Sequence, residues 1–148
     1  KLSRLYQRLV EDSQLASVVS TELGDTRDRY LFFVGLDLKK ETDLNRTETI
    51  LFEELERLTT SPPTAQELRR AKNQCQMQVL CDSETALDQA LQLGCMEALH
   101  SYEYWHDYAR RIEEVSRDQV TSVADRYCSR SRSIVGTLVD GNGQIGNL

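Results

Sequence analysis

The chain has 148 residues, 39% of them hydrophobic and 28% charged, a composition typical of one soluble globular domain. No apolar run approaches the length of about 20 residues that a membrane-spanning helix requires. The formal net charge of −6 argues against a nucleic-acid partner, because a phosphate backbone requires Lys and Arg clustered on one face. The chain starts at Lys1, with no Met and no apolar leader, so we expect a processed chain or a fragment.

The first predicted element is an amphipathic helix that leads directly into a strand. It occupies the segment 3–19, which we call the N-terminal corner. Leu5 and Leu9 share a helical face, and residues 12–14 (DSQ) interrupt the helical pattern. From Leu15 onward the residues are small or β-branched, as is typical of a strand.

Two strands, 15–23 and 29–38, are predicted to form an antiparallel hairpin. Gly, Asp and Thr in segment 24–28 provide the turn chemistry between them. The second strand has one mixed face and one continuously apolar face, the latter made of Tyr30, Phe32, Val34, Leu36 and Leu38. This pattern indicates a sheet that is fully covered on one side and partly covered on the other.

After the hairpin the hydrophobic period becomes helical, which predicts helices over 43–61, 64–79, 83–99, 103–115 and 116–127. Ser61-Pro62-Pro63 ends the first of these, because proline lacks an amide donor. Thr64 with Glu67, and Ser116 with Gln119, are capping boxes that mark the starts of two helices.

The apolar stripe of each helix is expected to face the core. In the second helix this stripe is Leu68, Ala71, Cys75 and Val79, and in the third it includes Leu87, Leu91, Gly94 and Cys95. In the first helix the polar residues expected outside the stripe are Glu48, Glu53, Glu54 and Arg57. Cys75 and Cys95 are therefore interpreted as small core hydrophobes, with disulfide bonding or metal binding as the alternatives.

Residues 133–139 (SIVGTLV) read as a third strand, followed by a Gly- and Asn-rich tail. The order of elements indicates an α+β fold, in which an antiparallel sheet is flanked by helices. We assign residues 1–140 to one domain and 141–148 to a flexible tail. Three strands are few for so much helix, so the sheet is expected to need strands from elsewhere. An open sheet edge favours pairing with another chain.

Motifs for catalysis or metal binding are missing from the sequence. There is no H-E-x-x-H, no inverted H-x-x-E-H, no G-x-S-x-G and no glycine-rich phosphate loop. His100 and His106 are six residues apart, so they do not share a helical face and are expected at helix ends or on the surface. No cysteine pair has C-x-x-C spacing. An aromatic cluster that favours core or interface packing over a pocket is made of Tyr102, Tyr104, Trp105 and Tyr108.

The chain resembles the C-terminal part of a pitrilysin/insulinase-type zinc peptidase subunit, the family that includes mitochondrial processing peptidase. The resemblance covers residues 3–139 and rests on segments that occur in order. They are SRLYQRLVEDSQLASVV, YLFFVGLDLKK, PTAQELRRAKNQ, ETALDQALQLGCMEAL and VSRDQVTSVADRY. The resemblance implies an incomplete copy of the zinc-peptidase domain, in which helices flank an antiparallel sheet beside a peptide-binding chamber.

The resemblance also implies that zinc is held by an H-x-x-E-H helix in an upstream or partner domain, and that this chain binds no cofactor. Many family members place an Arg and a Tyr, seven residues apart, near the scissile carbonyl as oxyanion donors. The matching positions here are Val10 and Ser17, and neither can replace those donors. Arg8 lies about 200° around the helix from Val10 and is a poor substitute. The chain alone is therefore predicted to be inactive, although its family is one of zinc metalloendopeptidases.

We expect a non-catalytic lobe that forms chamber wall and subunit contacts. The alternatives are a structural or assembly subunit of the same family, and a stand-alone helical protein-binding module that uses the aromatic surface at 102–105. Expected partners are a peptide or unfolded polypeptide, an upstream domain, and a second subunit in a homo- or hetero-dimer. The resemblance favours the bacterial periplasm or cell envelope over a mitochondrial location.

Overall fold

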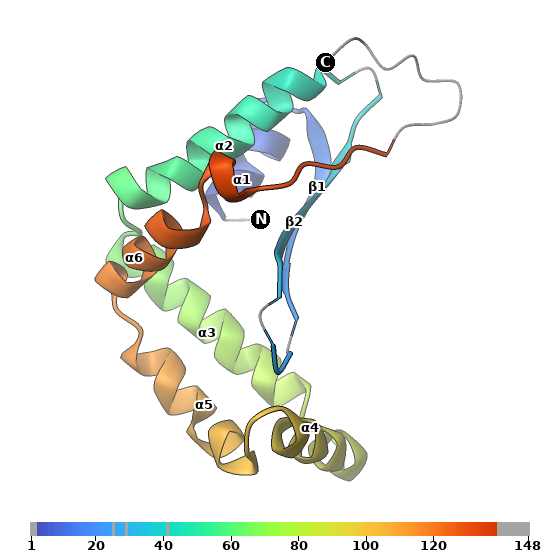
Figure 1. Cartoon of the computed structure of the whole chain (residues 1–148), viewed down its shortest axis with the longest axis vertical. Coiled ribbons are helices and arrows are strands. Elements are labelled where there is room, and N and C mark those ends of the chain that lie inside the picture. Colours follow the sequence, from blue (N-terminus) through green and yellow to red (C-terminus); the bar gives the residue numbers. More distant parts are fainter. Residues whose placement is uncertain (1–2, 25, 29, 41, 139–148) are drawn as a thin grey trace.

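The computed structural model describes residues 3–24, 26–28, 30–40 and 42–138. It has an α+β architecture with a two-stranded antiparallel sheet, which confirms the predicted fold class. In the view of Figure 1, helices α2 to α6 form an open arc, and the β1–β2 hairpin extends along its open side. No helix among the described residues is long and apolar enough to cross a membrane.

The N-terminal corner begins as the short helix α1 (Arg4–Tyr6) and continues as the π-helical segment η1 (Gln7–Asp12). The hydroxyl of Ser3 caps the start by accepting a hydrogen bond from the Tyr6 amide at 3.3 Å. The predicted helix is confirmed, but its second half has the wider π geometry. Such π segments are rare and occur mostly as single turns.

Strands β1 (Ala16–Leu23) and β2 (Phe32–Leu38) form the hairpin, somewhat shorter than the predicted pair. Leu23 lies opposite Phe32 at the far end, and a register shift occurs at the near end between Ala16 and Val18. Ser17 therefore sits in a bulge, the usual irregularity where a strand bends out of the ladder.

The core lies where the near end of the hairpin meets η1 and α2 (Leu44–Thr60). Its buried residues are Leu9, Leu15, Ala16 and Ile50, and the half-buried residues packed against it are Leu5, Val10, Val19, Leu36 and Leu38. Asp43 is the N-cap of α2, and its carboxylate accepts a hydrogen bond from the Arg46 amide at 3.0 Å. The apolar face predicted for the second strand is thus confirmed. Only the half next to the core, at Leu36 and Leu38, is covered.

Four further helices follow: α3 (Ala65–Cys81), α4 (Ala86–Leu99), α5 (Tyr102–Glu114) and α6 (Arg117–Tyr127). Both predicted capping boxes, at Thr64 and at Ser116, are present. A third capping box, Thr85 with Asp88, starts α4 two residues later than predicted. A short 3₁₀ turn, η2 (Arg130–Arg132), follows α6.

The helices pack in two groups. Helix α6 lies on α2, where Ala124 and Phe52 are buried and the guanidinium of Arg130 stands 5.1 Å above the Phe52 ring. Arg130 also donates to the Glu48 carboxylate at 2.5 Å. Helix α5 packs against α3 and α4.

The inward orientation predicted for several helix residues is wrong. Ala71 and Cys75 on α3, and Leu91 and Cys95 on α4, are exposed, and no residue of α3 is buried. The side chain buried on α4 is Met96. These stripes are amphipathic, but the described chain provides too little facing surface to cover them.

The third strand predicted at 133–139 is also wrong over its described part, because residues 133–138 have no regular structure. Ile134 is 93% exposed and Leu138 is fully exposed. These residues suit a strand by propensity, but within the described part of the chain they pair with no strand. Val139, the predicted domain boundary at 140 and the predicted tail at 141–148 lie outside the described residues.

One ionic contact fixes the N-terminal corner to the junction of α2 and α3. Arg4 makes a two-pronged pair with Glu67, with Nε to Oε1 at 2.8 Å and Nη2 to Oε2 at 2.9 Å. Arg4 also donates to the carbonyl oxygens of Ser61 at 2.7 Å and Pro62 at 3.2 Å. Glu67 in turn accepts from the Thr64 amide at 2.7 Å, so one carboxylate both caps α3 and binds α1.

These contacts predict a stability effect that depends on pH. The hydrogen bond from Arg4, followed by that from Thr64, lowers the pKa of Glu67 from 4.5 to about 2. Because the folded pKa is depressed, the stabilisation is present above pH 4.5 and is lost as the pH falls toward 2. Glu67→Gln should lower the free energy of unfolding at pH 7 by about 1–2 kcal/mol.

The measurement is urea unfolding of wild type and variant between pH 7 and pH 2. The difference between the two proteins should shrink as the pH falls below 4.5. Glu56→Gln on the exposed face of α2 is the matched control and should change little. A Glu67→Gln deficit that stays constant down to pH 2 would contradict the ionic origin of the effect.

Candidate functional site

The candidate site is the N-terminal corner, where η1 turns into β1. The turn is made at Gln14, which has a positive φ of 53°, uncommon for a residue other than glycine. The Leu15 amide donates to the Leu9 carbonyl at 2.9 Å, and the Leu15 carbonyl accepts from the Lys39 amide at 3.0 Å and the Thr42 hydroxyl at 3.1 Å. The corner is therefore held on both sides of its turn by defined hydrogen bonds.

Val10 packs against the apolar core at this corner. Its side chain is half-buried beside the cluster that contains Leu9 and Ile50. An aliphatic side chain in this place stabilises the corner by burial and offers no hydrogen-bond donor. The family resemblance matches Val10 to the position of a catalytic Arg, and that match stays a prediction. The contacts that Val10 makes in the structure are packing contacts.

Ser17 lies in the bulge of β1, and its hydroxyl donates to the backbone carbonyl of Asp37 at 3.0 Å. This bond crosses to the neighbouring strand, where the register shift leaves the regular ladder incomplete. The one donor of Ser17 is thus engaged within the hairpin. The structure brings Val10 and Ser17 to the same corner, but it gives each a separate packing or pairing role.

Arg8, the nearest alternative donor, binds carboxylates of α2. Its Nε lies 3.1 Å from Oε1 of Glu54 and its Nη2 lies 3.4 Å from Oε2 of Glu53. Arg57 reaches the same Glu54 oxygen at 2.7 Å. Glu54 is only 3% exposed, so its predicted place outside the apolar stripe is wrong. Two guanidiniums compensate its buried charge.

Sequence reasoning missed both carboxylate contacts of this region, Glu67 with Arg4 and Glu54 with Arg8. The three-residue spacing of Glu54 and Arg57 was a usable signal for one ion pair on α2. The pair of Arg4 with Glu67 spans 63 positions and has no local signature.

Both histidines contact aromatic side chains of α5. His100 is the C-cap of α4 and His106 lies on α5, and both are exposed as predicted. Their rings contact aromatic neighbours, His100 with Tyr104 at 5.1 Å and His106 with Tyr102 at 6.2 Å between centroids. Within the described ranges, no group of three or more His, Cys, Asp or Glu is placed to hold a metal ion.

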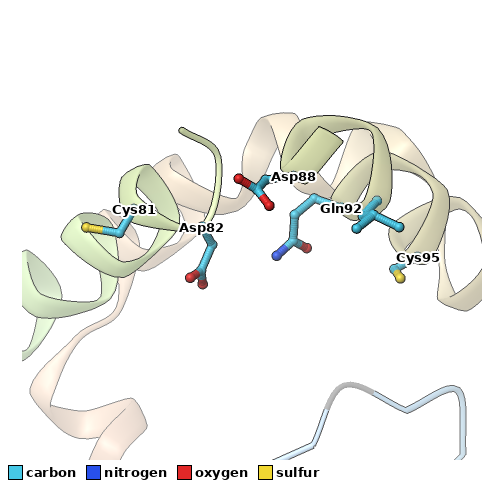
Figure 2. A pocket seen from close by; sticks show the side chains of 6 residues that line it. Cys81, Asp82, Asp88, Gln92 and Cys95 are labelled. Atoms are coloured by element: carbon cyan, nitrogen blue, oxygen red, sulfur yellow. The ribbon is translucent and has the colours of Figure 1, made fainter. Parts of the chain in front are cut away.

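A hollow of about 340 Å³ lies between the end of α3 and the helix α4. Figure 2 shows Asp82, Asp88 and Gln92 beside the same space, with Cys81 and Cys95 at its opposite ends. Both thiols are free and exposed, and no histidine or cationic side chain lines the hollow. The lining therefore offers thiols and carboxylates, but no histidine or cation that would activate a thiol as a nucleophile.

The aromatic cluster of α5 is half-buried. Trp105 stacks on Tyr108 with ring centroids 5.8 Å apart, and the guanidinium of Arg111 stands 4.7 Å from the Tyr104 ring. These contacts run along one helix, so the predicted core or interface packing of the cluster stays a prediction.

A family model described as the peptidase M16 inactive domain matches residues 1–75. The chain is 27% identical to a protein described as a zinc protease from Bordetella pertussis Tohama I, with a TM-score of 0.77 over 88% of this chain and 71% of that one. A search of curated proteins found no match.

Two other solved structures share the fold. The inactive peptidase domain of a protein described as a zinc protease from Bordetella parapertussis is 24% identical, with a TM-score of 0.85 over 99% of this chain and 79% of that one. A protease from Helicobacter pylori is 19% identical, with a TM-score of 0.77 over 88% of this chain but 31% of that one. Because the matching family model covers half of the sequence, the chain belongs to the peptidase M16 inactive-domain family.

Proposed function

We propose that this chain is the non-catalytic lobe of a zinc peptidase, where it forms part of the wall of a peptide-binding chamber and contacts another domain or subunit. The proposal rests on the contacts that Val10 and Ser17 make at the N-terminal corner. Val10 packs in its core and Ser17 bonds the backbone of Asp37, so both positions serve the fold. Zinc and the residues that activate water would then be supplied by an upstream or partner domain.

The exposed surface supports a role in contacts. A compact monomer of 17.0 kDa exposes about 7,700 Å² by the usual scaling with mass, whereas this chain exposes 11,607 Å². Full exposure of the fifteen residues outside the described ranges would account for about 2,500 Å² of the difference. The rest of the difference in exposed area indicates surface that is suited to burial in an assembly.

The far half of the hairpin is the clearest such surface. Leu23 and Phe32 lie directly opposite each other on the face that is apolar near the core, yet they are 70% and 51% exposed. The sheet found within the described residues has only two strands, so each strand has an unpaired edge. Unpaired edges beside apolar side chains are typical sites for strand addition.

A structural or assembly subunit without any peptidase activity would use the same surfaces. The two functions differ in the remainder of the parent protein, where an intact H-x-x-E-H favours a peptidase and a degraded one favours a scaffold. The envelope location expected from the resemblance stays a prediction.

The first test concerns catalysis. The double variant Val10→Arg with Ser17→Tyr, purified and supplied with Zn²⁺, should not hydrolyse an unfolded peptide, because the two donors alone cannot activate water. The assay is mass spectrometry of the peptide after incubation with wild type or variant, with circular dichroism to confirm that both are folded. Cleavage that requires zinc and stops on chelation would overturn the assignment as a non-catalytic lobe.

The second test concerns association through the hairpin. Sedimentation of the purified chain should show a dimer or larger species, and Phe32→Lys should weaken that association by at least about tenfold, because burial of a Phe side chain contributes roughly 1.5–3 kcal/mol. Asn45→Lys, which adds the same charge on the exposed start of α2, should leave the association unchanged. A wild-type chain that stays monomeric with no added partner would count against the contact role of the hairpin.

A further inference from the structure

A second hollow of about 380 Å³ lies at the junction of α3, the end of α5 and the start of α6, away from the N-terminal corner. Its lining includes three cationic side chains, Arg69, Lys72 and Arg117, together with the amide of Asn73 and one carboxylate, Glu113. The side chains that line it therefore carry a formal charge of +2, in a chain whose net charge is −6.

The three cations are not neutralised by the protein. Lys72 donates to the backbone carbonyl of Glu113, and Nε of Arg117 donates to the backbone carbonyl of Pro63 at 2.5 Å. Over the described ranges, no carboxylate lies within 4.0 Å of the charged nitrogens of Arg69, Lys72 or Arg117.

Other arginines of the chain behave differently, since Arg4, Arg8, Arg57, Arg110 and Arg130 each pair with at least one carboxylate. The carboxylate of Glu113 makes no ion pair within 4.0 Å with these cations, and its Oε2 accepts from Gln76 at 3.4 Å. Positive charges gathered in a hollow without an acidic partner attract an anion from solution.

Two helix starts add to this field. Helix α3 begins beside the hollow at Ala65 and α6 begins beside it at Arg117. Each contributes the partial positive charge of its N-terminus, which an acidic residue of its first turn, Glu67 or Asp118, partly offsets. Their capping boxes already use backbone amides of the first turns, so side chains must provide the direct contacts to a bound anion.

We propose that this hollow binds an oxyanion, either phosphate or a carboxylate, held by Arg69, Lys72 and Arg117. Guanidinium and ammonium groups are the side chains best suited to such ligands, and Asn73 can add an amide donor. A bound oxyanion would join α3 to α6, two helices from the two separately packed groups. This inference does not depend on the proposed peptidase role.

The test is calorimetric titration of the chain at constant ionic strength with two probes. One probe is inorganic phosphate, and the other is a short peptide with a free C-terminal carboxylate, compared with the same peptide amidated. Either probe should bind saturably, and the double variant Arg69→Gln with Lys72→Gln should bind it at least about tenfold more weakly, because two cationic hydrogen-bond donors are lost.

Arg70→Gln is the matched control, since Arg70 is the next residue on α3 but does not line the hollow. It should leave the affinity unchanged, and thermal unfolding should show that all variants remain folded. Binding of phosphate would identify a free ion as a ligand, and binding of the free but not the amidated peptide would identify a carboxylate. The proposal is overturned if neither probe binds saturably, or if the double variant binds as tightly as Arg70→Gln.

Discussion

The guanidinium of Arg4 connects parts of the chain that are about sixty residues apart. It pairs with Glu67 at the start of α3. It also donates to the backbone carbonyl oxygens of Ser61 and Pro62, which follow the end of α2. Because Glu67 also closes the capping box of α3, the same carboxylate sets where that helix begins and where the N-terminal helix lies. The position of the N-terminal corner against α2, and hence the small core around Leu9, depends on this contact.

This constraint explains why the corner serves as a structural joint. Its cations are engaged by α2 and α3, Val10 fills part of the core, and Ser17 bonds the neighbouring strand. The rest of the molecule extends from this joint as a hairpin and a group of helices that leave much apolar surface uncovered.

The sequence predicted those features that have a local cause. Thr64 with Glu67 and Ser116 with Gln119 mark helix starts within four residues, and an unbroken row of apolar residues at every second position marks the second strand. Features that depend on residues far away in the sequence were either not predicted or predicted wrongly. The contact of Arg4 with Glu67 spans 63 positions, and Cys75 and Cys95 lie on amphipathic stripes with no facing surface. Residues 133–138 suit a strand but pair with neither β1 nor β2 in the described ranges.

Hydrogen–deuterium exchange of the dilute chain tests most directly whether the N-terminal corner is the joint on which the structure depends. Exchange reports local opening, and it is slowest where burial and hydrogen bonding are most complete. The account predicts the slowest exchange at the amides of Ser13, Leu15 and Lys39, and fast exchange in the far half of the hairpin around Leu23 and Phe32. The account would be contradicted if exchange were equally slow along the whole hairpin. It would also be contradicted if the amides of the corner exchanged faster than those of the hairpin.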